Sequence, residues 1–254
     1  MDKVVISNED QLKQYLNTLG INVDMFTYTP DMNDEYLMNH PWVMKDRAYY
    51  DNPNFWRTLF DRGIDPAIKF MMNDTRVNPN NLGICNSCLY TDREEAFILC
   101  ERHLISLGNE EEKIIDMNGF MWILVQQNKV EKLKKMIDLA EKLQIKPMHK
   151  SWGNISYGDA ILEAVKFDDD KLFNFLVQFE LDTTLNESMP YCVACKYGHY
   201  AKALKLVEKG YDYKTMHNLG LKMIKRNEDY KLDLSDKDKE ACKSLLKLYG
   251  EKVE

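Results

Sequence analysis

The chain has 254 residues, of which 44% are hydrophobic, and a formal net charge of −7. This composition is sufficient for a buried core, and the negative charge excludes a global basic field for nucleic-acid phosphates. No run approaches the about 18 apolar residues of a membrane span, and the N-terminus lacks the features of a signal peptide. We therefore expect a cytoplasmic protein whose partner is another protein, rather than a membrane or nucleic acid.

The first predicted helix runs from Asn8 to Leu19. Asn8 can cap it, Glu9 and Asp10 suit its first turn, and Gly20 ends it. The stretch from 21 to 53 mixes prolines with scattered aromatic residues, which predicts short helices and loops. We interpret residues 1–54 as an N-terminal helical cap.

Residues 55–143 are predicted to form degenerate helical repeats. A helix pair is expected around a turn at Gly63, followed by a loop over residues 78–83. A helix over 92–107 and a hairpin of helices over 120–125 and 130–143 complete this region.

The best repeat lies within residues 144–215 and has no gap. Three pairs of identical residues are 30 positions apart: Ala164 and Ala194, Leu176 and Leu206, and Asp182 and Asp212. A fixed period of this size is typical of a stacked array of two-helix units. Residues 216–254 then form a predicted C-terminal helical cap, with helices over 216–224 and 239–248.

The second copy of this unit resembles an ankyrin repeat. Met189-Pro-Tyr-Cys-Val-Ala-Cys-Lys-Tyr-Gly-His199 matches the pattern Thr-Pro-Leu-His-x-Ala-Ala-x-x-Gly-His. The resemblance implies an all-α solenoid of ankyrin-like helical hairpins with helical caps at both ends. Two departures are that Lys202 stands where the family usually has an aliphatic residue, and that the spacing is 30 residues.

Divergent repeats of this kind, in a chain rich in Asn, Asp, Lys, Tyr and Met, are similar to ankyrin-like accessory proteins of phages and large DNA viruses. That resemblance implies a viral accessory protein that binds and inhibits a host protein in the host cytoplasm. We find no phosphate-binding loop, nucleophile elbow or paired metal-binding histidines, so an enzyme is not expected.

The sharpest chemical motif is Cys85-x2-Cys88-x11-Cys100-x2-His103. A loop-borne cysteine pair followed by a helical Cys and His one turn apart can supply four tetrahedral ligands to a structural zinc ion. The alternative is ordinary packing of small residues in a repeat helix. If zinc is present, a zinc-containing nucleic-acid-associated regulatory protein becomes the alternative function.

Four aromatic residues flank the two repeat copies and are our candidate binding anchors. They are Trp152, Tyr157, Tyr211 and Tyr213. Large rings in polar surroundings add contact area to an interface at low entropic cost. The alternative is that they pack against neighbouring helices.

Overall fold

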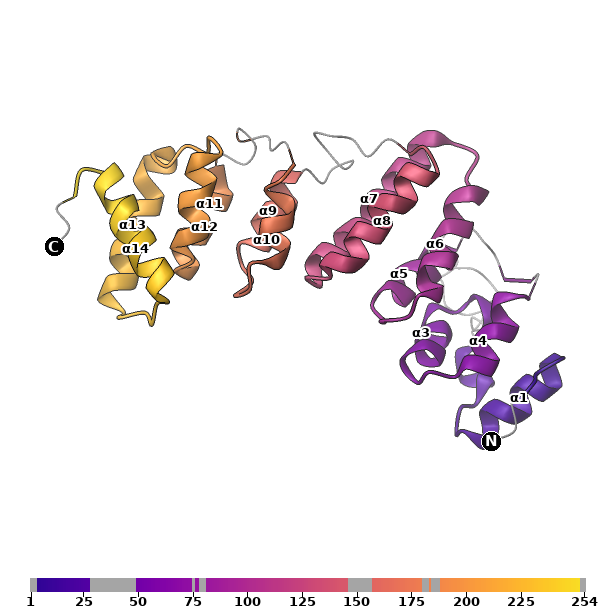
Figure 1. Ribbon diagram of the computed structural model, residues 1–254. Coiled ribbons are helices and arrows are strands. Elements are labelled where there is room, and N and C mark those ends of the chain that lie inside the picture. The colour runs from indigo at the N-terminus through magenta and orange to yellow at the C-terminus, as the bar shows by residue number, and fades with distance from the viewer. Residues whose placement is uncertain are drawn as a thin grey trace, which may run out of the picture. The chain divides into compact units, whose positions relative to one another are not determined.

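The computed structural model describes residues 4–27, 49–74, 76–77, 81–145, 157–179, 183 and 188–251. All regular structure among these residues is helical (Figure 1), which confirms the predicted all-α class. The chain divides into two compact units, 1–116 and 117–254, a coarser division than the four segments expected from sequence. No helix in the described ranges has both the length and the apolar character needed to cross a membrane.

The first unit contains short helices around a small core. In chain order they are α1 (Glu9–Thr18), η1 (Val23–Phe26), η2 (Tyr49–Asp51), α3 (Pro53–Asp61), α4 (Asp65–Met72), α5 (Leu82–Leu89), α6 (Glu95–Ser106) and the start of α7 (Glu110–Gln126). Helix α3 packs against both α4 and α5, and α5 packs against α6. Trp56 of α3 is completely buried among them.

The predicted first helix is confirmed with its signals. The Asn8 side chain accepts a hydrogen bond from the Gln11 amide at 2.9 Å and so caps α1. Leu12 and Leu16, one turn apart, are both buried. Gly20 follows the helix at φ +73°, a left-handed conformation that glycine adopts without strain.

Several helix boundaries differ from the sequence-based expectation, and two of them can be traced to a capping asparagine. Asn81 and Gly83, predicted to lie in a loop, belong to the beginning of α5, because the Asn81 side chain accepts a hydrogen bond from the Ile84 amide at 3.2 Å. Helix α7 starts at Glu110, ten residues earlier than predicted. Asn109 accepts from the Glu111 amide at 2.9 Å and thereby caps it.

The second unit consists of the remainder of α7 and consecutive helix pairs. They are α8 (Val130–Lys142), α9 (Tyr157–Ala164), α10 (Lys171–Leu176), α11 (Met189–Tyr197), α12 (Tyr200–Glu208), α13 (Thr215–Asp229) and α14 (Asp236–Leu248). Helix α11 packs against α9, α12 and α13, and α12 packs against α14. Each pair therefore contacts the pair before it or after it in sequence.

The turn inside the best-matching repeat forms as its sequence predicts. Pro190 occupies the first turn of α11, where its missing amide proton costs nothing, and Gly198 ends the helix at φ +77°. Ala194 of α11 is completely buried, as is Ala164 at the equivalent position of α9. Small side chains at these two positions allow the first helices to pack closely.

Candidate functional site

The four predicted zinc ligands lie on two packed helices. Cys85 and Cys88 are on α5 rather than in a loop, and Cys100 and His103 are on α6. All four side chains are buried. Burial raises the pKa of Cys88 and of Cys100, which favours neutral thiols unless a cation lies beside them.

His103 has a specific carboxylate neighbour. Its Nε2 atom lies 2.7 Å from Oδ2 of Asp116 on α7, within the first unit. Across the ranges that the structure describes, no group of three or more Cys, His, Asp or Glu side chains is arranged to hold a metal ion. A zinc ion at the four predicted positions therefore stays a prediction for metal analysis to decide.

The four aromatic anchors do not form one exposed cluster in the described part of the chain. Trp152 lies outside the described residues. Tyr157 is the first residue of α9, but the structure describes only its backbone. Tyr211 is only 2% exposed, so its side chain packs within the protein, and its role as a binding anchor stays a prediction. The ring of Tyr213 packs edge-on against Tyr249 at 5.2 Å between centroids.

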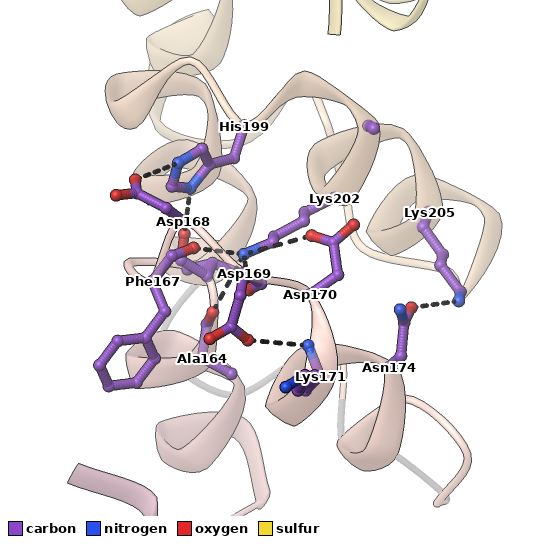
Figure 2. Close-up of polar contacts among 12 residues, drawn as sticks. Ala164, Phe167, Asp168, Asp169, Asp170, Lys171, Asn174, His199, Lys202 and Lys205 are labelled. Carbon is purple, nitrogen blue, oxygen red and sulfur yellow. Dashed lines mark hydrogen bonds and ion pairs between the residues drawn. The ribbon is translucent and has the colours of Figure 1, made fainter. Parts of the chain in front are cut away.

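A cluster of polar contacts lies in the second unit, around Lys202 of α12 (Figure 2). This side chain is buried, and its ammonium reaches back to the turn between α9 and α10. It donates to the carbonyl oxygens of Asp169 at 2.9 Å, of Ala164 at 3.4 Å and of Phe167. The Asp170 carboxylate lies 3.5 Å away. We call this arrangement the Lys202 cluster.

Lys202 donates to the last carbonyl group of α9, that of Ala164, and to two carbonyl groups of the turn that follows, those of Phe167 and Asp169. A helix leaves its final carbonyl groups without intrahelical partners, and a positive charge at that end is favourable. Since an ammonium has three protons and four acceptors surround it, every proton has an acceptor. Burial lowers the pKa of Lys202, and the charge of Asp170 opposes this shift.

His199 makes a second connection to the same turn. Its Nδ1 atom donates to the Val165 carbonyl oxygen at 2.7 Å, and its Nε2 atom lies 3.5 Å from Oδ1 of Asp168 (Figure 2). Both His199 and Lys202 come from the pair α11–α12, whereas the groups that they contact follow α9. The cluster therefore fastens one helix pair to the preceding one.

The same kind of connection recurs one repeat later. Cys195 lies 30 positions after Val165, and its carbonyl oxygen accepts a hydrogen bond from the Asn227 side chain at 2.8 Å. Asn227 belongs to α13, the first helix of the following pair. The C-terminal ends of both α9 and α11 are thus held by a side chain from the next pair.

Helix α14 adds two contacts to this network. Lys237 Nζ lies 2.7 Å from Oδ2 of Asp170, and Oδ1 of Asp238 accepts from the Ala201 amide at 3.0 Å. Burial alone would raise the pKa of Asp170, but its bonds with Lys237 and Lys202 outweigh burial and lower it. The chemistry of the cluster is therefore that of fixed ion pairs and backbone capping.

The sequence carries one signal for the Lys202 cluster. Lys202 departs from the aliphatic residue usual in the repeat, and three consecutive aspartates at 168–170 precede it by 32 to 34 residues. A buried lysine needs partners of this kind.

In comparisons with known proteins, no protein family, no curated protein and no solved structure matches the chain.

Proposed function

We propose that this chain is a non-enzymatic protein–protein interaction module built from ankyrin-like helical hairpins stacked in series. The observation that carries the proposal is the recurring connection between consecutive pairs. Val165 and Cys195 are 30 residues apart, and the carbonyl group of each is bonded by a side chain of the following pair. Packing of each helix pair chiefly against its sequence neighbours is the defining property of a repeat array.

Such an array offers an extended surface, because each hairpin buries the sides that face its neighbours and leaves its remaining surface exposed. Arrays of this kind commonly bind proteins over several hairpins at once. The Lys202 cluster supports a scaffolding role, since its polar groups are used within the fold. The ankyrin-like resemblance extends the proposal to a host-cell protein that is inhibited when bound.

The test begins with the full-length chain immobilised and exposed to a cell lysate. An immobilised all-helical protein of similar net charge serves as the control for charge-driven capture. A protein retained only by this chain is then purified and titrated against it by calorimetry. We expect saturable binding of fixed stoichiometry with Kd below about 1 μM, that is, more than about 8 kcal/mol.

Two outcomes would contradict the proposal. If the purified chain converts a small molecule catalytically, an enzyme replaces the binding module. If the retained ligand is a nucleic acid whose binding weakens steeply with salt, the nucleic-acid-associated alternative is favoured, because release of counterions makes such binding strongly salt-dependent.

A further inference from the structure

A cavity in the first unit lies between the residues that precede α1 and one side of α4. Its volume is about 790 Å³, within the range of about 300–1,000 Å³ that is usual for binding pockets. Val4, Val5 and Ile6 line one wall of it, and Pro66, Lys69 and Phe70 of α4 line the other. We call this cavity the α4 groove.

The wall that α4 contributes is the side that the core leaves partly open. Pro66, Lys69, Phe70 and Asn73 follow one another at intervals of three, one and three residues, which places them on the same side of the helix. Pro66 and Phe70 are half-buried, whereas the residues that α4 buries in the core are Ala67, Ile68 and Met71. The α4 groove therefore has apolar surface that the fold does not fully use.

The opposite wall offers free backbone groups. The chain makes no helix or turn from residue 4 to residue 7, and Val4 and Val5 are 47% and 75% exposed. Within the ranges that the structure describes, the backbone amide and carbonyl groups of residues 4–6 form no hydrogen bond. All three side chains are β-branched and suit a strand. A run of this kind is a template on which another extended chain can pair.

The groove also has one cation without a partner. Its two carboxylates are already paired, because Asp65 lies 2.7 Å from Nη2 of Arg93 and Asp74 lies 2.6 Å from Nη2 of Arg76. The exposed ammonium of Lys69 makes no ion pair or hydrogen bond with any residue in the described part of the chain. A carboxylate that a ligand brings into the groove would meet Lys69 without competition.

We propose that the α4 groove binds an extended segment of a protein partner, in which apolar side chains and one carboxylate lie on the same side. The backbone of the segment would pair with residues 4–6, its apolar side chains would cover Pro66 and Phe70, and its carboxylate would meet Lys69. A small carboxylic acid would leave three consecutive backbone units unpaired, which favours a peptide. This inference rests on the proposed function and specifies the conformation and charge of the bound segment.

The test uses the fluorescent peptide Ser-Val-Thr-Val-Thr-Glu-Thr-Ser as the probe, with fluorescence anisotropy on the full-length chain. Amides of alternate residues in a strand point to the same edge. Two further peptides therefore carry N-methyl groups, one at the valines and the glutamate, the other at the threonines. We expect one of these to bind at least about tenfold more weakly than the probe and the other to bind within about twofold of it. No saturable binding of the probe, or equal binding of the two N-methylated peptides, would overturn the proposal.

A second comparison tests the role of Lys69. A peptide with glutamine in place of the glutamate should bind the unaltered chain about threefold more weakly than the probe at low salt. In Lys69→Gln the two peptides should bind equally. The matched control is Lys243→Gln, which removes an exposed charge from α14 of the second unit and should leave the preference for glutamate unchanged.

A variant of the opposite wall then locates the binding. The double variant V4S/V5S should weaken binding of the probe at least about fivefold, because it removes apolar contact area from the groove. The matched control is Y230S, which removes a 71% exposed ring from the second unit and should leave binding unchanged. Melting temperatures of all variants should match that of the unaltered chain, since the replaced side chains are exposed.

Unaltered binding by V4S/V5S, or a preference for glutamate that persists in Lys69→Gln, would overturn the assignment of this groove. If the unaltered chain sediments as a dimer and V4S/V5S as a monomer, a second copy occupies the groove and the proposal is also overturned. The partner purified by lysate capture separates the two proposals. If that partner binds both V4S/V5S and Lys69→Gln with unaltered affinity, the groove is wrong while the interaction module stands.

Discussion

At the scale of single residues, Lys202 combines two roles that are usually separate. Its hydrocarbon chain occupies the buried position that an aliphatic residue would fill, and its ammonium bonds the carbonyl groups beyond α9. A charge at this depth is tolerated because four oxygen acceptors replace its hydration. The position therefore couples packing within α12 to the turn between α9 and α10 of the preceding helix pair.

Replacing Lys202 by methionine should destabilise the protein by about 1–3 kcal/mol, because methionine keeps most of the apolar volume but leaves the carbonyl acceptors without a donor. The matched control is Lys205→Met, which loses a 3.0 Å hydrogen bond to Asn174 near the surface and a cation–π contact with the Phe173 ring at 5.9 Å, and should cost at most about 0.5 kcal/mol. Urea denaturation measures the free energy of unfolding of both variants. Equal effects of the two changes would show that the buried ammonium contributes little.

Glu9 makes a pH-dependent contribution in the first unit. Its carboxylate lies 2.9 Å from Lys13 and 2.6 Å from Arg76, and these hydrogen bonds lower its pKa from 4.5 to about 2. A lowered folded-state pKa gives stability that is present above the unfolded pKa and lost as pH falls through the folded one.

We therefore expect Glu9→Gln to lower the melting temperature slightly at pH 6, by the equivalent of at most about 1 kcal/mol, since the Glu9 side chain is 31% exposed and solvent screens its ion pairs. The difference from the unaltered chain should shrink between pH 4.5 and about 2. Thermal scans across this pH range test it, and a difference that is constant with pH would contradict it.

At the scale of elements, α13 approaches α11 through a glycine. A Cβ atom on Gly220 would lie 2.4 Å from the ring of Tyr191, which is completely buried. This residue pair sets how closely the two first helices can pack. A larger residue at position 220 would force the helices apart or move the ring.

Gly220→Ala should therefore destabilise the protein by about 1–3 kcal/mol through overpacking. Gly119 in α7 is the matched control, because a Cβ there would meet nothing within 4 Å. Gly119→Ala should instead stabilise by about 0.5–1 kcal/mol by reducing the backbone entropy lost on folding. Denaturant titration of both variants gives the sign of the change in the free energy of unfolding. A change of the same sign for both variants would refute the argument.

The pairing of α5 with α6 offers the test of zinc. Zinc held by Cys85, Cys88, Cys100 and His103 predicts one metal equivalent in protein purified without chelator, and a lower melting temperature after chelation. Elemental analysis and thermal scans measure the two quantities. Less than about a tenth of an equivalent, with no effect of chelator, would leave these residues as packing in the core.

At the scale of the whole molecule, the division into two compact units predicts which elements a destabilising substitution affects. Nearest-neighbour contacts confine a perturbation to adjacent elements. In Lys202→Met, amide hydrogen exchange should accelerate in α9 to α14, while the slowest amides of α3, α5 and α6 keep their rates. Uniform acceleration in both units, measured by mass spectrometry, would show that the chain unfolds as one cooperative body.

The sequence by itself determined the helical class, most helix positions and the repeat unit. These follow from local signals, such as the cap at Asn8, the glycine at 198 and the 3.6-residue spacing of apolar side chains. The early start of α7 was also readable, because Asn109 precedes three glutamates suited to a first helical turn.

Only the tertiary structure decided which side chains meet across elements. Gly83 suggested a loop, but it lies within α5, where a Cβ would be 3.1 Å from Pro53. Tyr211 looked exposed beside polar neighbours, yet it is buried. The partners of Lys202 lie 32 to 38 residues away in sequence. Contacts at such separations depend on how helix pairs stack, which no local pattern specifies.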